Sequence, residues 1–122
     1  MIEFAFLAPA LFTIVLGIVE VGRMFYVRQS LEYATETAAR YYMVNPAADF
    51  ADVKRTLREA MAGGMGADIA IVDPPTSTAN CNGNAAVTCT TITATYTFNS
   101  VASFLNLGNP QLQAQAQAVR VQ

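Results

Sequence analysis

The chain of 122 residues is 53% apolar and 13% charged, with seven Lys and Arg against nine Asp and Glu. This length suits a single folded domain, because a second core would need roughly another 100 residues. The apolar content excludes intrinsic disorder, and a net charge of −2 argues against a nucleic-acid binder, which needs clustered cations. The chain contains no His, the commonest general base and metal ligand, so no catalytic, cofactor or metal site is expected.

The first segment is predicted to be a membrane-spanning helix. Residues 4–19 are sixteen positions without a charge, and Thr13 is the only polar side chain among them. Their Leu, Ile, Val and Phe residues would contribute about −3 to −6 kcal/mol to insertion. With its apolar flanks, the segment 1–22 reaches the ~20 residues that a helix needs to cross the hydrocarbon core. A buried core helix would need a larger protein around it, and a secretory signal peptide would begin with a basic region.

Two residues in this segment are unfavourable in a membrane helix. An unpaired carboxylate at Glu3 opposes insertion, so Glu3 needs a cationic partner such as an N-terminal amine, unless it rests in the headgroup region. Pro9 removes one helix hydrogen bond and clashes with the carbonyl four residues earlier, so it is expected to kink or locally melt the helix. At the other end, Glu20 and Arg23 are three residues apart and can pair at the membrane boundary.

Beyond the membrane the helix is expected to continue over residues 23–44 with one apolar face. Its apolar positions recur at intervals of three and four, which indicates packing against a core; they are Met24, Val27, Leu31, Ala34, Ala38 and Tyr41. Asn45-Pro46 predicts a break and the start of a second helix over residues 46–62, with Asn45 as its N-cap. Gly63-Gly64 is expected to end that helix.

The rest of the sequence predicts strands at about 68–73, 90–98 and 111–121. Apolar residues alternate with Thr in the second strand and with Gln in the third, which is typical of half-buried antiparallel strands. The segment between them, with Phe104, Leu105 and Leu107, is expected to be a loop holding at most one helical turn. An amphipathic helix laid over such a small antiparallel sheet makes an α+β head of residues 23–122.

The two cysteines, Cys81 and Cys89, lie in a segment rich in Asn, Gly and Thr. A disulfide between them would stabilise the fold by about 2.5 kcal/mol; the alternative is two free buried thiols. Two Cys without His do not complete a four-ligand zinc site, and their spacing is not that of a C-x-x-C redox pair.

A disulfide implies an oxidising compartment, so the head is expected outside the cytoplasm and the N-terminus inside. Arg23 and Arg28, which follow the apolar run, oppose this orientation under the positive-inside rule. A basic leader removed before maturation would reconcile the two indications.

An apolar N-terminal helix with an early carboxylate, an amphipathic continuation and a small cysteine-bearing head resembles a type IV pilin or pseudopilin. The closest resemblance is to the TadE-like family of pilus-assembly pseudopilins, over residues 1 to about 42. It is carried by the stretches Ile2-Glu-Phe-Ala-Phe-Leu-Ala-Pro-Ala-Leu, Gly17-Ile-Val-Glu-Val-Gly-Arg-Met-Phe-Tyr-Val-Arg-Gln-Ser-Leu-Glu and Ala38-Ala-Arg-Tyr.

The resemblance implies cleavage by a prepilin peptidase and a Glu at the fifth mature position that pairs with the amine of a neighbouring subunit. That Glu is Glu3 here, so either two residues are absent from this numbering or the cleavage register differs. Pro9 matches the family's proline in the same apolar stretch. Glu3 and Pro9 are therefore the candidate subunit-assembly residues.

The implied function is that of a structural subunit in a type IV-family pilus that serves adhesion or surface attachment. Its implied partners are copies of itself or related pilins, the inner membrane before assembly, and the pilus assembly machinery. The head would lie in the periplasm and later on an extracellular pilus. The alternative is a monomeric membrane-anchored binding module that uses the Thr-rich strand face, Thr91 to Thr97. A membrane enzyme is disfavoured, because the sequence has no Gly-rich phosphate loop and no suitably spaced acid pair.

Overall fold

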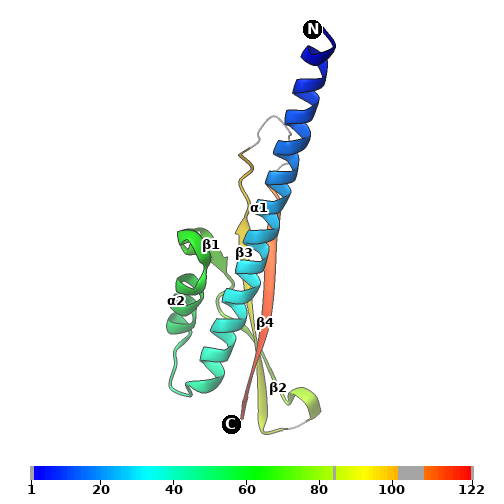
Figure 1. Cartoon of the computed structure of the whole chain (residues 1–122). Coiled ribbons are helices and arrows are strands. Elements are labelled where there is room, and N and C mark those ends of the chain that lie inside the picture. The colour runs from blue at the N-terminus through cyan, green and yellow to red at the C-terminus, as the bar shows by residue number, and fades with distance from the viewer. Residues whose placement is uncertain (1, 84, 102–108, 122) are drawn as a thin grey trace.

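The computed structural model describes residues 2–83, 85–101 and 109–121, with the backbone alone at positions 2, 3, 5 and 82. In chain order its elements are α1 (Ile2–Val44), α2 (Phe50–Ala60), the 3₁₀ segment η1 (Ala62–Asp68), β1 (Ile69–Ile71), β2 (Thr76–Ala79), the 3₁₀ turn η2 (Cys81–Gly83), β3 (Val87–Thr97) and β4 (Gln111–Val121). Figure 1 shows the first part of α1 projecting beyond the head, while its second part packs against both α2 and the sheet. The expected α+β arrangement, a long N-terminal helix on a small antiparallel sheet, is confirmed.

The sheet is built around β3. Strand β4 pairs with β3 along its whole length, from Val87 opposite Val121 to Thr97 opposite Gln111. The other edge of β3 is shared by β2, beside its first half, and β1, beside its second half, and all pairings are antiparallel. Strands β1 and β2 thus form one interrupted edge, and the interruption includes Pro74-Pro75, because proline has no N–H for a strand ladder.

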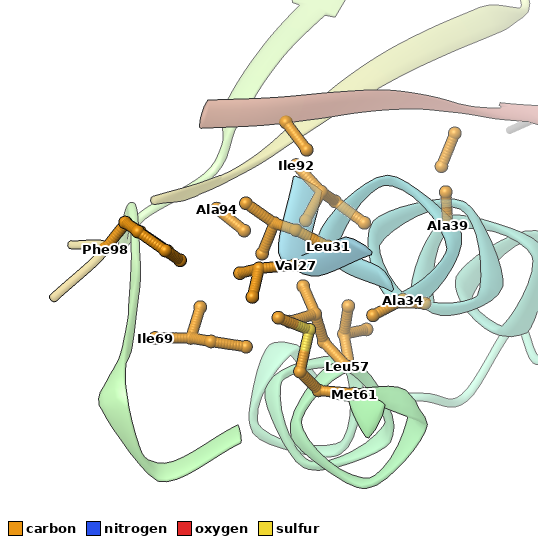
Figure 2. Packing of buried hydrophobic residues seen from close by; sticks show 14 residues of the cluster. Val27, Leu31, Ala34, Ala39, Leu57, Met61, Ile69, Ile92, Ala94 and Phe98 are labelled. Atoms are coloured by element: carbon orange, nitrogen blue, oxygen red, sulfur yellow. The ribbon is translucent and has the colours of Figure 1, made fainter. Parts of the chain in front are cut away.

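The core lies where α1, α2 and β3 meet, and the predicted apolar face of α1 lines it. Figure 2 shows Leu31 of α1 between the side chains of the sheet and those of α2. Leu31, Leu57 and Ile92 are fully buried, and burying such a side chain contributes about 1.5–3 kcal/mol. The other buried apolar members of the core are Val27, Ala34, Ala38, Ala39, Val53, Met61, Ile69, Ala94, Phe98, Ala114 and Ala118.

The second helix starts later than the sequence predicts. Its N-cap is Asp49, whose carboxylate accepts a hydrogen bond from the N–H of Phe50 at 2.7 Å. Asn45 instead closes α1, because its backbone N–H and its side-chain Nδ2 both donate to the carbonyl of Tyr41, at 3.1 and 3.0 Å. The helix ends at Ala60, before Gly63-Gly64, which adopt φ of 68° and 73° inside η1. Glycine adopts such angles without a steric cost.

The strands differ from the predicted ranges mainly at their ends. Strand β4 spans the expected range of 111–121, β3 runs from 87 to 97 rather than from 90 to 98, and β1 holds only 69–71 of the expected 68–73. Strand β2 was not predicted, because its four residues are all exposed and show no alternation. The expected loop residues Phe104, Leu105 and Leu107 lie outside the described residues.

Candidate assembly and membrane-anchoring site

The first half of α1 exposes apolar side chains on all its sides. Between Phe4 and Val21 the large apolar side chains are 44–78% exposed. By length and composition α1 is able to cross a membrane. An exposed apolar surface of this extent is rare on a soluble monomer, so these side chains need lipid or the apolar surface of another protein. The set comprises Phe4, Phe6, Leu7, Leu11, Phe12, Ile14, Val15, Leu16, Ile18, Val19 and Val21.

The expected melting of the helix at Pro9 is not observed. Helix α1 runs without a break from Ile2 to Val44 with Pro9 inside it. The loss of one hydrogen bond at proline is local, and membrane helices tolerate it because neighbouring groups bind the freed backbone atoms. The Thr13 hydroxyl donates to the carbonyl of Pro9 at 2.8 Å. Thr13, the one polar side chain of the apolar run, is therefore held by the helix backbone.

Glu3 belongs to the first turn of α1. Its side chain and the N-terminal amine lie outside the described residues, so the pairing expected of Glu3 stays a prediction. Glu3 and Pro9 are brought onto the same exposed half of α1, on the part that projects from the head (Figure 1).

Glu20 marks the point where the exposed half of α1 meets the head. Its residue surface is 4% exposed, although Val19 and Val21 on either side are 55% and 44% exposed. One carboxylate oxygen accepts from Arg23 at 3.1 Å, which is the predicted pair. The other accepts from the backbone N–H of Val101 at 2.8 Å. This second contact joins residues that are 81 positions apart, and nothing in the local sequence pattern indicates it.

Cys81 and Cys89 form a disulfide. Cys81 opens η2, and Cys89 lies buried in β3 opposite Thr78 of β2. The bond therefore ties the turn after β2 to the central strand, at the end of the head away from the N-terminus (Figure 1). The alternative of two free thiols is wrong, because no free cysteine is present.

The Thr-rich face proposed for ligand binding is partly used within the sheet. The hydroxyl of Thr95 donates to the carbonyl of Ala70 at 3.2 Å. Along this face Thr91, Thr93 and Thr95 are half-buried. The Thr95 hydroxyl is therefore engaged within the sheet.

Charged residues on α2 form a solvated face. A surface hollow of about 720 Å³ lies between α2 and η1. Two of its cations are already paired, Lys54 with Asp73 at 2.6 Å and Arg55 with residues of its own helix. Among the described residues no group of three or more His, Cys, Asp or Glu is placed to hold a metal ion.

The comparisons with known proteins bear on the N-terminal helix. Residues 1–40 match the family model described as TadE-like protein. No curated protein and no solved structure matches the chain. The matched residues contain the whole exposed apolar half of α1, the Glu20–Arg23 pair and most of the buried face that α1 gives to the head. The N-terminal third of the chain is accordingly similar to TadE-like proteins.

Proposed function

We propose that this chain is a structural subunit of a Tad-type pilus in the type IV family, and that the pilus serves surface attachment. The first half of α1 holds the subunit in the inner membrane and later packs against copies of the chain or related pilins. The observation that carries this proposal is the apolar surface around the whole circumference of a helix that projects from a folded head. The TadE-like match supports it, because the match covers that same surface.

The length of the apolar half of α1 suits a lipid bilayer, and its apolar surface suits the interior of a filament. The stretch from Ile2 to Val19 would span roughly 27 Å as a helix, close to the ~30 Å hydrocarbon core. Within lipid its backbone groups are satisfied by the helix itself. In a filament, neighbouring helices offer surroundings as apolar as lipid tails, so the exchange of one for the other costs the helix little.

Glu3 is assigned the role of setting the register between neighbouring subunits. A carboxylate in apolar surroundings is costly without a cation, and the amine of a neighbouring copy would provide one. Glu3→Gln should therefore insert into membranes normally but give few filaments, measured as pilin sheared from cells against pilin in the membrane fraction. Glu36→Gln, at a 63% exposed side chain on the outer side of α1, is the matched control. Wild-type filament yield from Glu3→Gln would contradict this role.

Self-assembly is tested by crosslinking in native membranes. A photoreactive amino acid at Phe12, which is 66% exposed, should give a ladder of multimers. The same group at Glu59, whose side chain is 70% exposed on α2, reports accidental proximity. Monomers alone from Phe12 would contradict assembly through α1 and would favour the membrane-anchored binding module.

The disulfide supports a head in the periplasm, since such bonds persist in oxidising compartments. Intact-mass measurement of the native protein, together with its N-terminal sequence, should show a processed N-terminus and oxidised Cys81 and Cys89. Free thiols that react with an alkylating reagent in intact native material would contradict a periplasmic head.

A further inference from the structure

The buried carboxylate of Glu20, at the junction of the membrane span and the head, has partners on α1 and on the residues that follow β3. The intrahelical pair with Arg23 is short-range and leaves the Arg23 side chain 46% exposed. The hydrogen bond from the Val101 N–H reaches Glu20 from the segment that follows β3. An ion pair between residues three apart on an exposed helix leaves both side chains in solvent, so residues 98–101, the described residues directly after β3, contribute to the burial of Glu20.

That segment is anchored at its base. The N–H of Phe98 donates to the carbonyl of Pro110 at 3.0 Å, which joins the two chain ends that leave β3 and enter β4. The Arg23 guanidinium lies 5.4 Å from the centroid of the Phe98 ring, within the range of cation–π attraction. Glu20 thus contacts Val101 and Arg23 contacts Phe98, so both hold residues 98–101 against one side of α1.

We propose that Glu20 is a positioning residue that latches the segment after β3 onto α1 and so fixes how deeply the helix enters the membrane. The latch places polar backbone beside the helix at Glu20, and lipid does not accommodate such groups unpaired. Val21 and Met24, the next apolar side chains along this part of α1, line a mostly apolar cavity with Phe98 and Pro110. Met24 is half-buried there, whereas Val21 stays 44% exposed.

Release of the latch would remove the polar backbone at Val101 from this part of α1 and leave the Glu20–Arg23 ion pair as the polar boundary of the span. Because the long Arg23 side chain can reach the headgroups from within the bilayer, the helix could then sink by up to about one turn, 5.4 Å. The inference depends on the membrane span in the proposed function and is independent of self-assembly.

The test separates the latch from the charge of Glu20. Val101→Pro removes the donating N–H and leaves Glu20 intact, because proline has no backbone N–H. Val101→Ala keeps that N–H and is the matched control, since the Val101 side chain is 76% exposed. The depth reporter is Ile18→Trp, at a 67% exposed position of a chain without Trp. The full-length variants are placed in phosphatidylcholine nanodiscs in which the lipids carry bromine at defined acyl depths.

With Val101→Pro, quenching of the Trp should shift towards lipids brominated deeper in the bilayer, whereas Val101→Ala should match the parent. Equal depth profiles for all three proteins, or the same shift in both variants, would overturn the latch. Absence of quenching in the parent would contradict the membrane span itself, so the two failures are distinguishable.

A second measurement needs no proline. Amide hydrogen exchange of Val101 in the unchanged chain should be slow, and Glu20→Ala should accelerate it roughly tenfold, the loss expected for one hydrogen bond. Exchange of Val101 in the unchanged chain at the rate of an unstructured peptide would overturn the proposal. A cooperative unfolding transition by circular dichroism in each variant shows that the head remains folded.

Discussion

The C-terminal end of α1 depends on a cation from the far end of the chain. A helix end carries unsatisfied carbonyls and partial negative charge, and the last turn of α1 has no basic residue. Arg120, near the end of β4, supplies the charge: its guanidinium donates to the carbonyl of Asn45 at 3.1 Å and to the carbonyl of Pro46. The same group lies 4.2 Å from the centroid of the Tyr42 ring.

Arg120→Ala should destabilise the fold by about 2–3 kcal/mol, because charge-assisted hydrogen bonds contribute about 1.5–3 kcal/mol and cation–π contacts about 0.5–1 kcal/mol. In a chain of this size a loss of 2 kcal/mol lowers the unfolding midpoint by roughly 10 °C. Arg120→Lys should lose about half as much, since Lys keeps the charge but lacks the planar fork of donors.

The assay is urea and thermal unfolding of the full-length chain in detergent micelles, followed by circular dichroism with the disulfide intact. Arg40→Ala is the matched control: its side chain is 76% exposed and 3.8 Å from Glu36, so it should cost less than ~0.5 kcal/mol. If Arg120→Ala and Arg40→Ala were equally stable, the C-terminal cap would have no energetic role.

Further substitutions test the core, the turn after α2 and the disulfide by the same unfolding measurement. Leu31→Ala should cost about 2–5 kcal/mol, while Leu11→Ala, at a 62% exposed position, should leave head unfolding unchanged; equal effects would refute the assigned core. A Cβ at Gly66 would overlap a backbone carbonyl in the last turn of α2, so Gly66→Ala should cost about 1–3 kcal/mol, and a neutral result would contradict that close approach. Replacing both Cys81 and Cys89 by Ser should cost about 2.5 kcal/mol, and an unchanged midpoint would show that the bond constrains nothing.

Periodicity was sufficient to predict the elements that bury one face. The spacing of Val27, Leu31, Ala34 and Ala38 predicts the side of α1 that the head covers, and all four are buried. The alternation of residues 111–121 predicts β4, where Ala114 and Ala118 face inward. In both elements the periodic pattern is clear because positions that face the core recur at the spacing of the helix or strand and are occupied by apolar residues.

Sequence periodicity does not predict the features that depend on hydrogen bonds to other parts of the chain rather than on a buried face. Strand β2 has no apolar face, and it is a strand because β3 offers it an edge. The start of α2 was misplaced because Asn45 and Asp49 are both suitable N-caps, and the structure uses Asn45 to close α1 through its bonds to Tyr41. The Glu20–Val101 contact is long-range, so no window of sequence contains it.

The distribution of burial along α1 bears on how one fold could serve in a membrane and in a filament. Among the described residues, the apolar core of the head draws on α1 only from Met24 onward, and contact with earlier residues is made at Glu20 and Arg23. Replacing lipid by neighbouring helices around residues 4–19 would therefore leave the packing of the head unchanged. Lipid tails and apolar helices are nearly equivalent surroundings for Leu, Ile and Phe. Replacing one by the other therefore does little to favour one axial position of neighbouring helices over another. Under the proposed function, the register between subunits would then come from polar groups on this half of α1, and the sequence places one of them, the carboxylate of Glu3, in its first turn.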